Sequence, residues 1–168
     1  MPKRILVSAC LLGKNCKYNG GNNFNQALAD YIAKQKDCDV EFEVISVCPE
    51  VLGGLSTPRI PAEIVNGKVT NKNGVSVDKE FRLGAEKALA IAKEKQVSLA
   101  ILQSRSPSCG SKEIYDGTFT KTLIPGEGVF AKRLRETGIR VIDAEDLETL
   151  LKTCLLYTSP SPRDRSLS

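Results

Sequence analysis

Apolar residues follow two alternating kinds of spacing along this chain. One kind is a short run rich in Val, Ile and Leu, which is typical of a buried strand. Such runs occupy positions 4–9, 41–47, 97–102 and 139–142. The other kind repeats every three or four residues, as on one face of a helix, and is found around positions 24–32, 78–96, 130–134 and 143–151. This alternation predicts an α/β fold: a doubly wound, Rossmann-like, mostly parallel sheet with helices on both faces of a single domain.

Local signals mark where some of these elements begin and turn. Asp78 stands at the start of the longest helical pattern, and Asp143 at the start of the last, so we expect each carboxylate to cap a helix. The connection from position 49 to 74 is long for a structural linker, and Asn66-Gly67 within it favours a tight hairpin turn. Ordered connections of this length are often functional, so we expect this one to contribute to a site.

The last fifteen residues break abruptly from the preceding pattern. They are rich in Ser and Pro, and the stretch through Asp164 resembles the translation of a transposase adapter used in sequencing libraries. We therefore interpret residues 154–168 as a non-native, adapter-derived tail and leave them out of the fold prediction. Residues 1–153 remain, which is enough chain for one domain with a single core.

Composition excludes several kinds of active site. The chain has no histidine, so Ser-His-Asp triads, Cys-His dyads and mixed Cys/His zinc sites are impossible. Aromatic residues make up 5% and there is no Trp, which disfavours a stacking surface for single-stranded nucleic acid. The net charge of +4 is too small to require a nucleic-acid partner. No apolar stretch has the length of a signal-peptide core or a membrane span, so we expect a cytoplasmic protein without a membrane partner.

Three cysteines stand where predicted strands give way to turns. Cys10, Cys48 and Cys109 each follow an apolar run and lie near Gly, Pro or Ser. Because parallel strands point their carboxyl ends at one crevice, we expect the three thiols to meet there. Three thiolates suit a [4Fe-4S] cluster with one iron left open, and zinc is the alternative metal. Taken singly, each cysteine is more often an inert, buried small residue.

The other two cysteines before the tail, Cys16 and Cys38, lack this setting at the end of a strand. We interpret both as structural or incidental. Five cysteines in a reducing compartment are an odd number, which favours metal binding or reactivity over a disulfide framework.

The cysteine segments also carry a family resemblance. The strings are Ser8-Ala9-Cys10-Leu11-Leu12-Gly13 with Tyr18-Asn19-Gly20, Cys48-Pro49-Glu50-Val51 with Gly54-Leu55, Pro58-Arg59 and Glu63, and Ser106-Pro107-Ser108-Cys109-Gly110 with Tyr115-Asp116-Gly117. Across positions 4–143 the chain resembles the thiouracil desulfurase family, formerly a domain of unknown function. The resemblance implies a catalytic domain of this kind over residues 1–153. One departure is Lys17-Tyr18-Asn19, where the family more often has Arg-Tyr-Asp.

The resemblance implies a cofactor and its ligands. Family members hold a [4Fe-4S] cluster with three cysteines and remove sulfur from thiolated uracil, which implies Cys10, Cys48 and Cys109 as ligands in this chain. It also implies catalytic roles for Glu50 and Ser106. Without the neighbouring Cys48, Glu50 is better explained as a loop-capping or solvated carboxylate. Without the resemblance, Ser106 is better explained as an ordinary turn residue.

Two further residues are candidate substrate contacts. Arg59 carries a cation suited to a pyrimidine carbonyl, and a salt bridge to Glu63 is the simpler alternative. Ser108 stands beside Cys109 in the same turn as Ser106.

Together these features predict an iron-sulfur-dependent, non-redox desulfuration of 2-thiouracil or 4-thiouracil to uracil and sulfide. A thiocarbonyl sulfur is soft and suits an open iron, and iron withdraws electron density from the ring carbon so that water can attack it. The expected partner is a small thiolated pyrimidine; nucleic acid is not expected, with thiolated tRNA left open. The alternatives are a persulfide-carrying sulfurtransferase with a nucleophilic cysteine and a non-enzymatic domain that binds metal or senses redox state.

Overall fold

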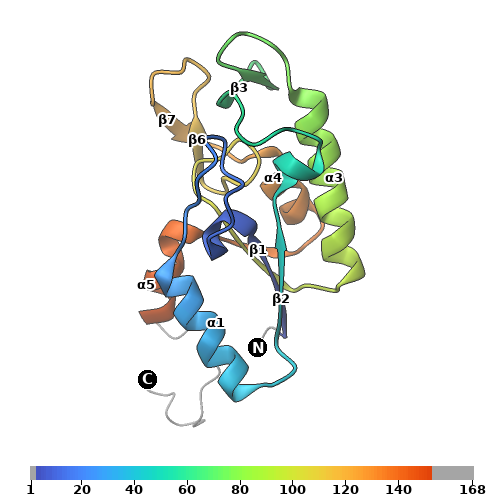
Figure 1. The fold of residues 1–168 in the computed structure, drawn as a ribbon, viewed down its shortest axis with the longest axis vertical. Coiled ribbons are helices and arrows are strands. Elements are labelled where there is room, and N and C mark those ends of the chain that lie inside the picture. The colour runs from blue at the N-terminus through green and yellow to red at the C-terminus, as the bar shows by residue number, and fades with distance from the viewer. Residues whose placement is uncertain (1–2, 153–168) are drawn as a thin grey trace.

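The computed structural model describes residues 3–152, and its centre is a sheet of four parallel strands (Figure 1). The strand order is β2-β1-β5-β8. The strands are β1 (Arg4–Ser8), β2 (Glu43–Val47), β5 (Leu99–Leu102) and β8 (Arg140–Asp143). In the central strand, Ile5 is in register with Val44 of β2 and with Leu99 of β5. All four predicted strands are confirmed, each within two residues of its expected ends. The predicted tail, residues 154–168, lies outside the described residues.

Helices cover both faces of this sheet, which confirms the doubly wound fold (Figure 1). The long helix α3 (Asp78–Glu94) and α4 (Val129–Glu136) lie on one face, and α1 (Gln26–Cys38) and α5 (Leu147–Lys152) lie on the other. Successive strand residues point to opposite faces. Leu6 therefore packs in the cluster that contains α3 and α4, whereas its neighbour Ile5 packs in the cluster that contains α1 and α5. Because β1 is covered on both sides, its three middle residues are all apolar and do not alternate with polar ones.

The two predicted caps have different outcomes. Asp143 caps the short 3-10 turn η2 (Ala144–Asp146) that leads into α5, and its carboxylate accepts a hydrogen bond from the Glu145 amide at 2.8 Å. The prediction for Asp78 is wrong, because Val77 is the N-cap residue and Asp78 already lies in α3. The Asp78 carboxylate instead accepts the Val69 amide at 3.0 Å and the Arg82 Nε at 2.8 Å. Asp78 thus ties the start of α3 to a neighbouring strand.

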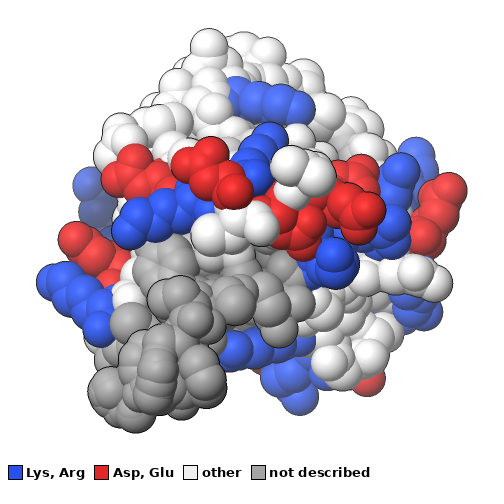
Figure 2. All heavy atoms as spheres, turned by 90° about the horizontal axis from the view of Figure 1, so that it is seen from below, with Lys and Arg blue, Asp and Glu red and all other residues white. Residues whose placement is uncertain are grey.

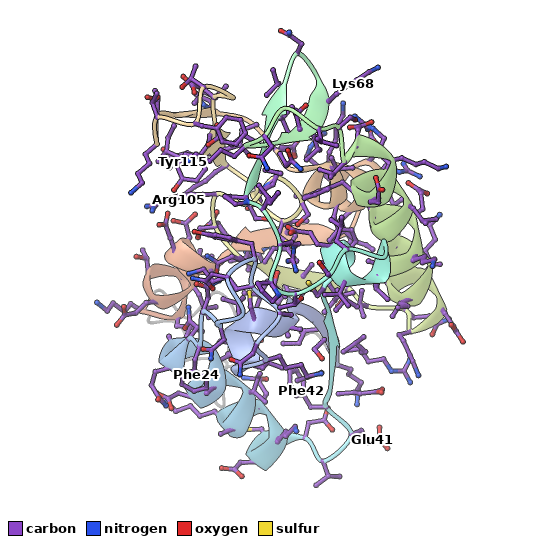
Figure 3. The ribbon with its side chains drawn as sticks, turned by 45° about the horizontal axis from the view of Figure 1, so that its top comes forward. Phe24, Glu41, Phe42, Lys68, Arg105 and Tyr115 are labelled. Atoms are coloured by element: carbon purple, nitrogen blue, oxygen red, sulfur yellow. The ribbon has the colours of Figure 1, made fainter. Side chains whose placement is uncertain are left out.

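Two antiparallel hairpins project beyond the carboxyl end of the sheet (Figure 1). The first joins β3 (Ala62–Val65) to β4 (Lys68–Asn71) through Asn66 and Gly67, at φ 51° and 80°, and confirms the predicted turn. The second, β6 (Glu113–Tyr115) with β7 (Leu123–Pro125), was not predicted. In Figure 3, Lys68 marks the tip of the first hairpin and Tyr115 lies in the second, while Phe42 lies near the opposite end of the molecule.

A short helix, α2 (Pro49–Leu52), packs against α3 with backbone nearly touching backbone. A Cβ atom placed on Gly84 of α3 would overlap the carbonyl oxygen of Pro49, and one placed on Gly53 would overlap the carbonyl oxygen of Glu80. Only glycine permits such an approach. Since α2 begins directly after Cys48 and contains Glu50, this contact fixes the position of both residues.

The surface seen from below in Figure 2 carries interspersed acidic and basic side chains rather than a patch of one sign over its coloured part. Exposed ion pairs of this kind include Arg133–Glu86 and Arg135–Glu127. Among residues 3–152, no helix combines the length and the apolar character needed to cross a membrane.

Candidate active site

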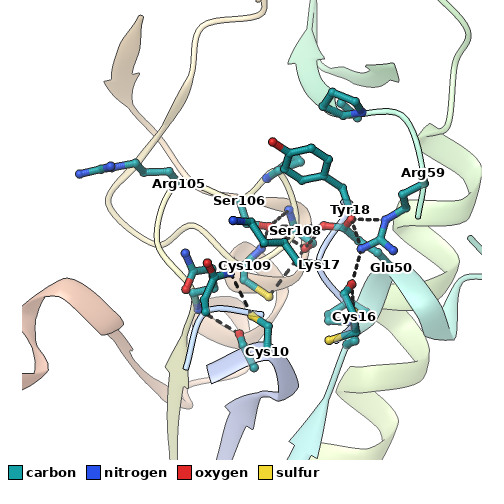
Figure 4. A pocket seen from close by; sticks show the side chains of 18 of the residues that line it. Cys10, Cys16, Lys17, Tyr18, Glu50, Arg59, Arg105, Ser106, Ser108 and Cys109 are labelled. Atoms are coloured by element: carbon teal, nitrogen blue, oxygen red, sulfur yellow. Dashed lines mark hydrogen bonds and ion pairs between the residues drawn. The ribbon is translucent and has the colours of Figure 1, made fainter. Parts of the chain in front are cut away.

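A cleft of about 910 Å³ opens at the carboxyl ends of the sheet strands, beneath the two hairpins (Figure 4). Its wall includes all three of the strand-end cysteines. Cys10 lies in the 3-10 turn η1 (Ala9–Leu12) that follows β1, Cys48 is the residue directly after β2, and Cys109 lies in the loop after β5. Because β1 pairs with both β2 and β5, the three strand ends are neighbours. The predicted convergence of these residues is therefore confirmed, while their role as ligands stays a prediction.

The strand-end thiols lie in largely buried surroundings. Burial raises the pKa of the Cys10 thiol, although its sulfur accepts a hydrogen bond from Asn23 Nδ2 at 3.5 Å. Burial also raises the pKa of Cys109, which outweighs hydrogen bonds from Ser8 and Ser108. Neighbouring thiols add to both effects, because each would repel a second negative charge. In the protein alone the thiol form of Cys10 and Cys109 is therefore favoured, and a bound cationic group would stabilise these two residues as thiolates.

The strand-end donors are thiols, which are the usual protein ligands of iron-sulfur clusters. Among residues 3–152, no three Cys, Asp or Glu side chains gather closely enough to hold one metal ion. A four-iron cluster asks for a different arrangement, because each cysteine binds its own iron at a separate corner. The five cysteines of this part of the chain are all free, so the thiols are available for such binding.

Cys16 lies near the strand-end cysteines, while its interpretation as structural or incidental stays a prediction. It lines the same cleft, and its backbone carbonyl lies 3.9 Å from the Cys48 sulfur. Burial, with the neighbouring Cys48 thiol, raises the pKa of Cys16 to about 12. Sequence spacing did not reveal this position because Cys16 follows no strand. The turn after Cys10 returns the chain to the cleft at Cys16. Cys38 is exposed at the end of α1, away from the cleft.

Glu50 is held at the centre of the cleft wall by partners on both of its carboxylate oxygens (Figure 4). Its Oε1 accepts Arg59 Nε at 2.9 Å, and its Oε2 accepts the Ser108 hydroxyl at 2.9 Å. The Ser106 hydroxyl lies 3.5 Å from the same Oε2. The side chain of Glu50 is 14% exposed, so it reaches the cleft without being fully solvated.

Ser106 and Ser108 belong to one tight turn before Cys109. The Ser106 hydroxyl oxygen accepts the backbone amides of Ser108 and Cys109, each at 3.1 Å, and lies 2.9 Å from the Ser108 hydroxyl. Ser106 thus has the turn chemistry expected of its sequence and also stands beside Glu50. Ser108 is only 2% exposed and donates to Glu50, so its hydroxyl is already engaged within the protein.

Arg59 is paired differently from the expected salt bridge. Its guanidinium contacts Glu50 at 2.9 Å, whereas Glu63 accepts the backbone amides of Gly117 and Phe119 at 2.9 and 3.1 Å. The alternative partner predicted for Arg59 is therefore wrong. Glu63 is buried and holds the loop of the second hairpin against the first.

Several residues of the cleft were not singled out as site residues from the sequence. Asn23 donates to the Cys10 sulfur, Lys17 and Tyr18 come from the turn beside Cys16, and Phe119 comes from the second hairpin. They reach the cleft only through loop conformation, which a periodic pattern does not encode. The Gly/Asn-rich composition of positions 19–23 is the one signal that marked this segment as a loop.

Comparisons with known proteins agree with this geometry. The model of the 2-thiouracil desulfurase family matches residues 5–146. YbbK of Bacillus subtilis (strain 168), an uncharacterized protein, is 43% identical over 157 residues, which cover 88% of this chain and 99% of YbbK. The solved structure of TudS, a [4Fe-4S]-dependent thiouracil desulfidase, is 37% identical with a TM-score of 0.80, covering 92% of this chain and 99% of that one.

The family match spans most of the described fold and includes every strand-end cysteine, as well as Glu50 and the Ser106–Cys109 turn. The solved relative shares the same α/β architecture at high structural similarity. The chain therefore belongs to the 2-thiouracil desulfurase family and is an enzyme of this type.

Proposed function

We propose that this protein removes sulfur from a small thiolated pyrimidine, 2-thiouracil or 4-thiouracil, by non-redox hydrolysis that yields the uracil and sulfide. The observation that carries the proposal is the meeting of three strand-end thiols with Glu50 in one cleft. The TudS relative is [4Fe-4S]-dependent, which supports the same cofactor for this chain.

Cys10, Cys48 and Cys109 would hold the cluster. They are soft donors, they come from three separate segments, and two of them are buried where a thiolate without a cation is unfavourable. When bound by three cysteines, such a cluster would supply a soft Lewis acid suited to a thiocarbonyl sulfur.

Glu50 is the proton-transfer group in this proposal. It stands two residues beyond Cys48, and its side chain lines the cleft. An ionised carboxylate is only an acceptor, so it can serve as a base. We infer that it takes a proton from the attacking water, so that the new carbon–oxygen bond forms as the carbon–sulfur bond breaks. Water supplies both the oxygen of the product and the protons of the released sulfide, so no electron donor is needed. Acid–base help of this kind contributes about 10² to 10⁴ in rate.

Ser106 would orient the reacting groups around Glu50. Its oxygen accepts two backbone amides, so its own proton points either to Ser108 or to Glu50. The Ser108 hydroxyl in turn donates to Glu50. These two hydroxyls therefore form a short directed chain that ends at the Glu50 carboxylate. We assign Ser106 to the orientation of water or substrate and Ser108 to the support of Glu50, in place of the direct substrate contact expected of Ser108.

The test is anaerobic reconstitution with iron and sulfide, followed by metal analysis, a visible spectrum and an assay of sulfide release. We expect about four irons per chain and turnover of 2-thiouracil or 4-thiouracil. Cys10→Ala, Cys48→Ala and Cys109→Ala should each lose the cluster. Cys38→Ala, which changes an exposed cysteine outside the cleft, is the matched control and should keep it, and Cys16→Ala should keep it as well.

Other outcomes lead to the competing functions. A full cluster that survives loss of any one strand-end cysteine contradicts the ligand assignment. Turnover without iron, with a persulfide found on a cysteine by mass spectrometry, indicates a sulfurtransferase. A stable cluster with no sulfide release from either thiouracil indicates a domain that only binds the metal group.

A further inference from the structure

Every nitrogen of the Arg59 guanidinium is engaged by the protein itself. Figure 4 shows its contacts with Glu50 and Cys16. Nε donates to Glu50 Oε1, Nη1 donates to the Ser56 carbonyl at 3.0 Å and to Thr57 Oγ1 at 2.9 Å, and Nη2 lies 2.9 Å from both Glu50 Oε1 and the Cys16 carbonyl. A guanidinium has five N–H donors. Four of them donate hydrogen bonds within the protein, and Nη2 is in addition in ion-pair contact with Glu50 Oε1. The side chain is 9% exposed, so little of it faces the cleft.

We propose that Arg59 is a positioning residue for Glu50 and not a contact for the substrate; the proposal rests on the proton-transfer role assigned to Glu50 above. Both Arg59 contacts to Glu50 go to Oε1. The carboxylate is thereby held with Oε2 turned toward Ser106 and Ser108. Arg59 therefore decides which oxygen of Glu50 serves proton transfer.

The same guanidinium connects Glu50 to the cysteine side of the cleft. Its Nη2 donates to the carbonyl of Cys16, and that carbonyl lies 3.9 Å from the Cys48 sulfur. One cation thus sets the spacing between the acid–base group and the wall that carries Cys16 and Cys48. A planar guanidinium can do this because its donors are spread over three nitrogen atoms, whereas the three donors of a lysine ammonium all lie on one nitrogen and cannot span the same acceptors.

This arrangement separates two kinds of kinetic result. Loss of a substrate contact raises KM, whereas loss of a positioning group lowers kcat and leaves KM unchanged. In the reconstituted enzyme, we expect Arg59→Ala to keep its cluster spectrum and a KM within about threefold of wild type, with kcat lowered about 30- to 100-fold, as for a misplaced catalytic group. Arg59→Lys, which keeps the charge, should recover only part of this loss.

Chemical rescue and a matched control sharpen the test. Guanidinium ion added at millimolar concentration should restore part of kcat in Arg59→Ala, because it can occupy the vacated site, and should do nothing for Glu50→Gln. The control is Arg82→Ala. Arg82 also donates Nε to a carboxylate, Asp78, and a terminal nitrogen to a backbone carbonyl, that of Gly67, but it lies outside the cleft. Its kcat should match wild type, with no response to guanidinium.

A second readout does not depend on turnover. Because Arg59 holds the Cys16 carbonyl, removal of the Arg59 side chain should loosen the turn that contains Cys16. Alkylation of Cys16 by iodoacetamide should then be several-fold faster relative to alkylation of the exposed Cys38. Peptide mass spectrometry on the purified protein measures this ratio. Arg82→Ala should leave this ratio unchanged. If Arg59→Ala does not fold, Arg59→Lys carries both measurements.

The results that overturn the proposal are distinct from those that overturn the desulfurase function. A raised KM with normal kcat in Arg59→Ala makes Arg59 a substrate contact, and wild-type kinetics with an unchanged Cys16 alkylation ratio remove any role for it. Absence of sulfide release from the wild-type enzyme refutes the function instead. In that case the Cys16 alkylation ratio alone decides whether Arg59 organises this wall.

Discussion

Replacing Gly84 by alanine tests whether the approach of α2 to α3 sets the geometry of the site. On an ordinary helix interior this change stabilises a protein by about 1 kcal/mol, because alanine is the better helix former. Here the added Cβ would overlap the Pro49 carbonyl oxygen and lie 2.8 Å from its carbonyl carbon, where real Cβ atoms keep at least 3.0 Å. The neighbouring group is backbone, so α2 as a whole has to move away.

The two effects have opposite signs, and their sizes decide the outcome. Overpacking of a well-packed contact costs about 1–3 kcal/mol, and we take the upper value because no flexible side chain can absorb the overlap. After the gain in helix propensity, the net loss is about 2 kcal/mol. For a domain of this size, 1 kcal/mol changes Tm by about 2–4 °C, so Tm should fall by about 4–8 °C.

The loss of activity should exceed what partial unfolding alone would cause. The moving helix follows Cys48 and carries Glu50, and a displacement of about 1 Å can reduce catalysis about 100-fold. Thermal unfolding by circular dichroism and sulfide release below the transition measure the two effects. Leu83→Ala, at an exposed neighbouring position on α3, is the control and should change neither. A Gly84→Ala protein with a Tm at or above that of wild type would refute the close approach.

Three further predictions concern other residues. Glu50→Gln should keep the cluster spectrum and lose about two to four orders of magnitude in sulfide release, with a smaller loss in Ser106→Ala; near-normal turnover of Glu50→Gln would mean that another group is the base. Burial raises the pKa of Asp78, but hydrogen bonds from Arg82 and the Val69 amide outweigh it and hold this pKa below its usual 3.8. The stability that the Asp78 charge provides is therefore complete above pH 3.8 and is lost as the pH falls through the folded pKa. Asp78→Asn should therefore be less stable than wild type in urea at pH 7, and the difference should shrink as the pH falls through the folded pKa of Asp78. A difference in stability that does not change with pH contradicts this account. Deletion of residues 154–168 should leave Tm and cluster content unchanged, and a large loss of Tm would show that the tail belongs to the core.

The strands and the order of layers could be predicted from the sequence because burial imposes a period on it. The middle of β1 is apolar at consecutive positions, since Leu6 faces one pair of helices and Ile5 and Val7 face the other. The turn at Asn66-Gly67 could be predicted because positive φ restricts the residue types that fit there. The Asp78 cap failed for the opposite reason: a carboxylate can accept either the first amides of its own helix or an amide of a neighbouring strand, and local sequence does not distinguish them.

The meeting of Cys10, Cys48 and Cys109 followed from the sequence in the same way, because parallel strands necessarily end at one edge of a sheet. The partners of Glu50 did not. Arg59 lies close to Glu50 in the chain, but the Cys16 carbonyl that Arg59 also contacts and the two serines beside the other carboxylate oxygen come from two separate loops. Loop conformation has no period and depends on what packs around it. By itself, the sequence therefore determined the scaffold and the edge where the chemistry-bearing thiols lie, whereas the tertiary structure alone decided which side chain holds the acid–base group and in what orientation.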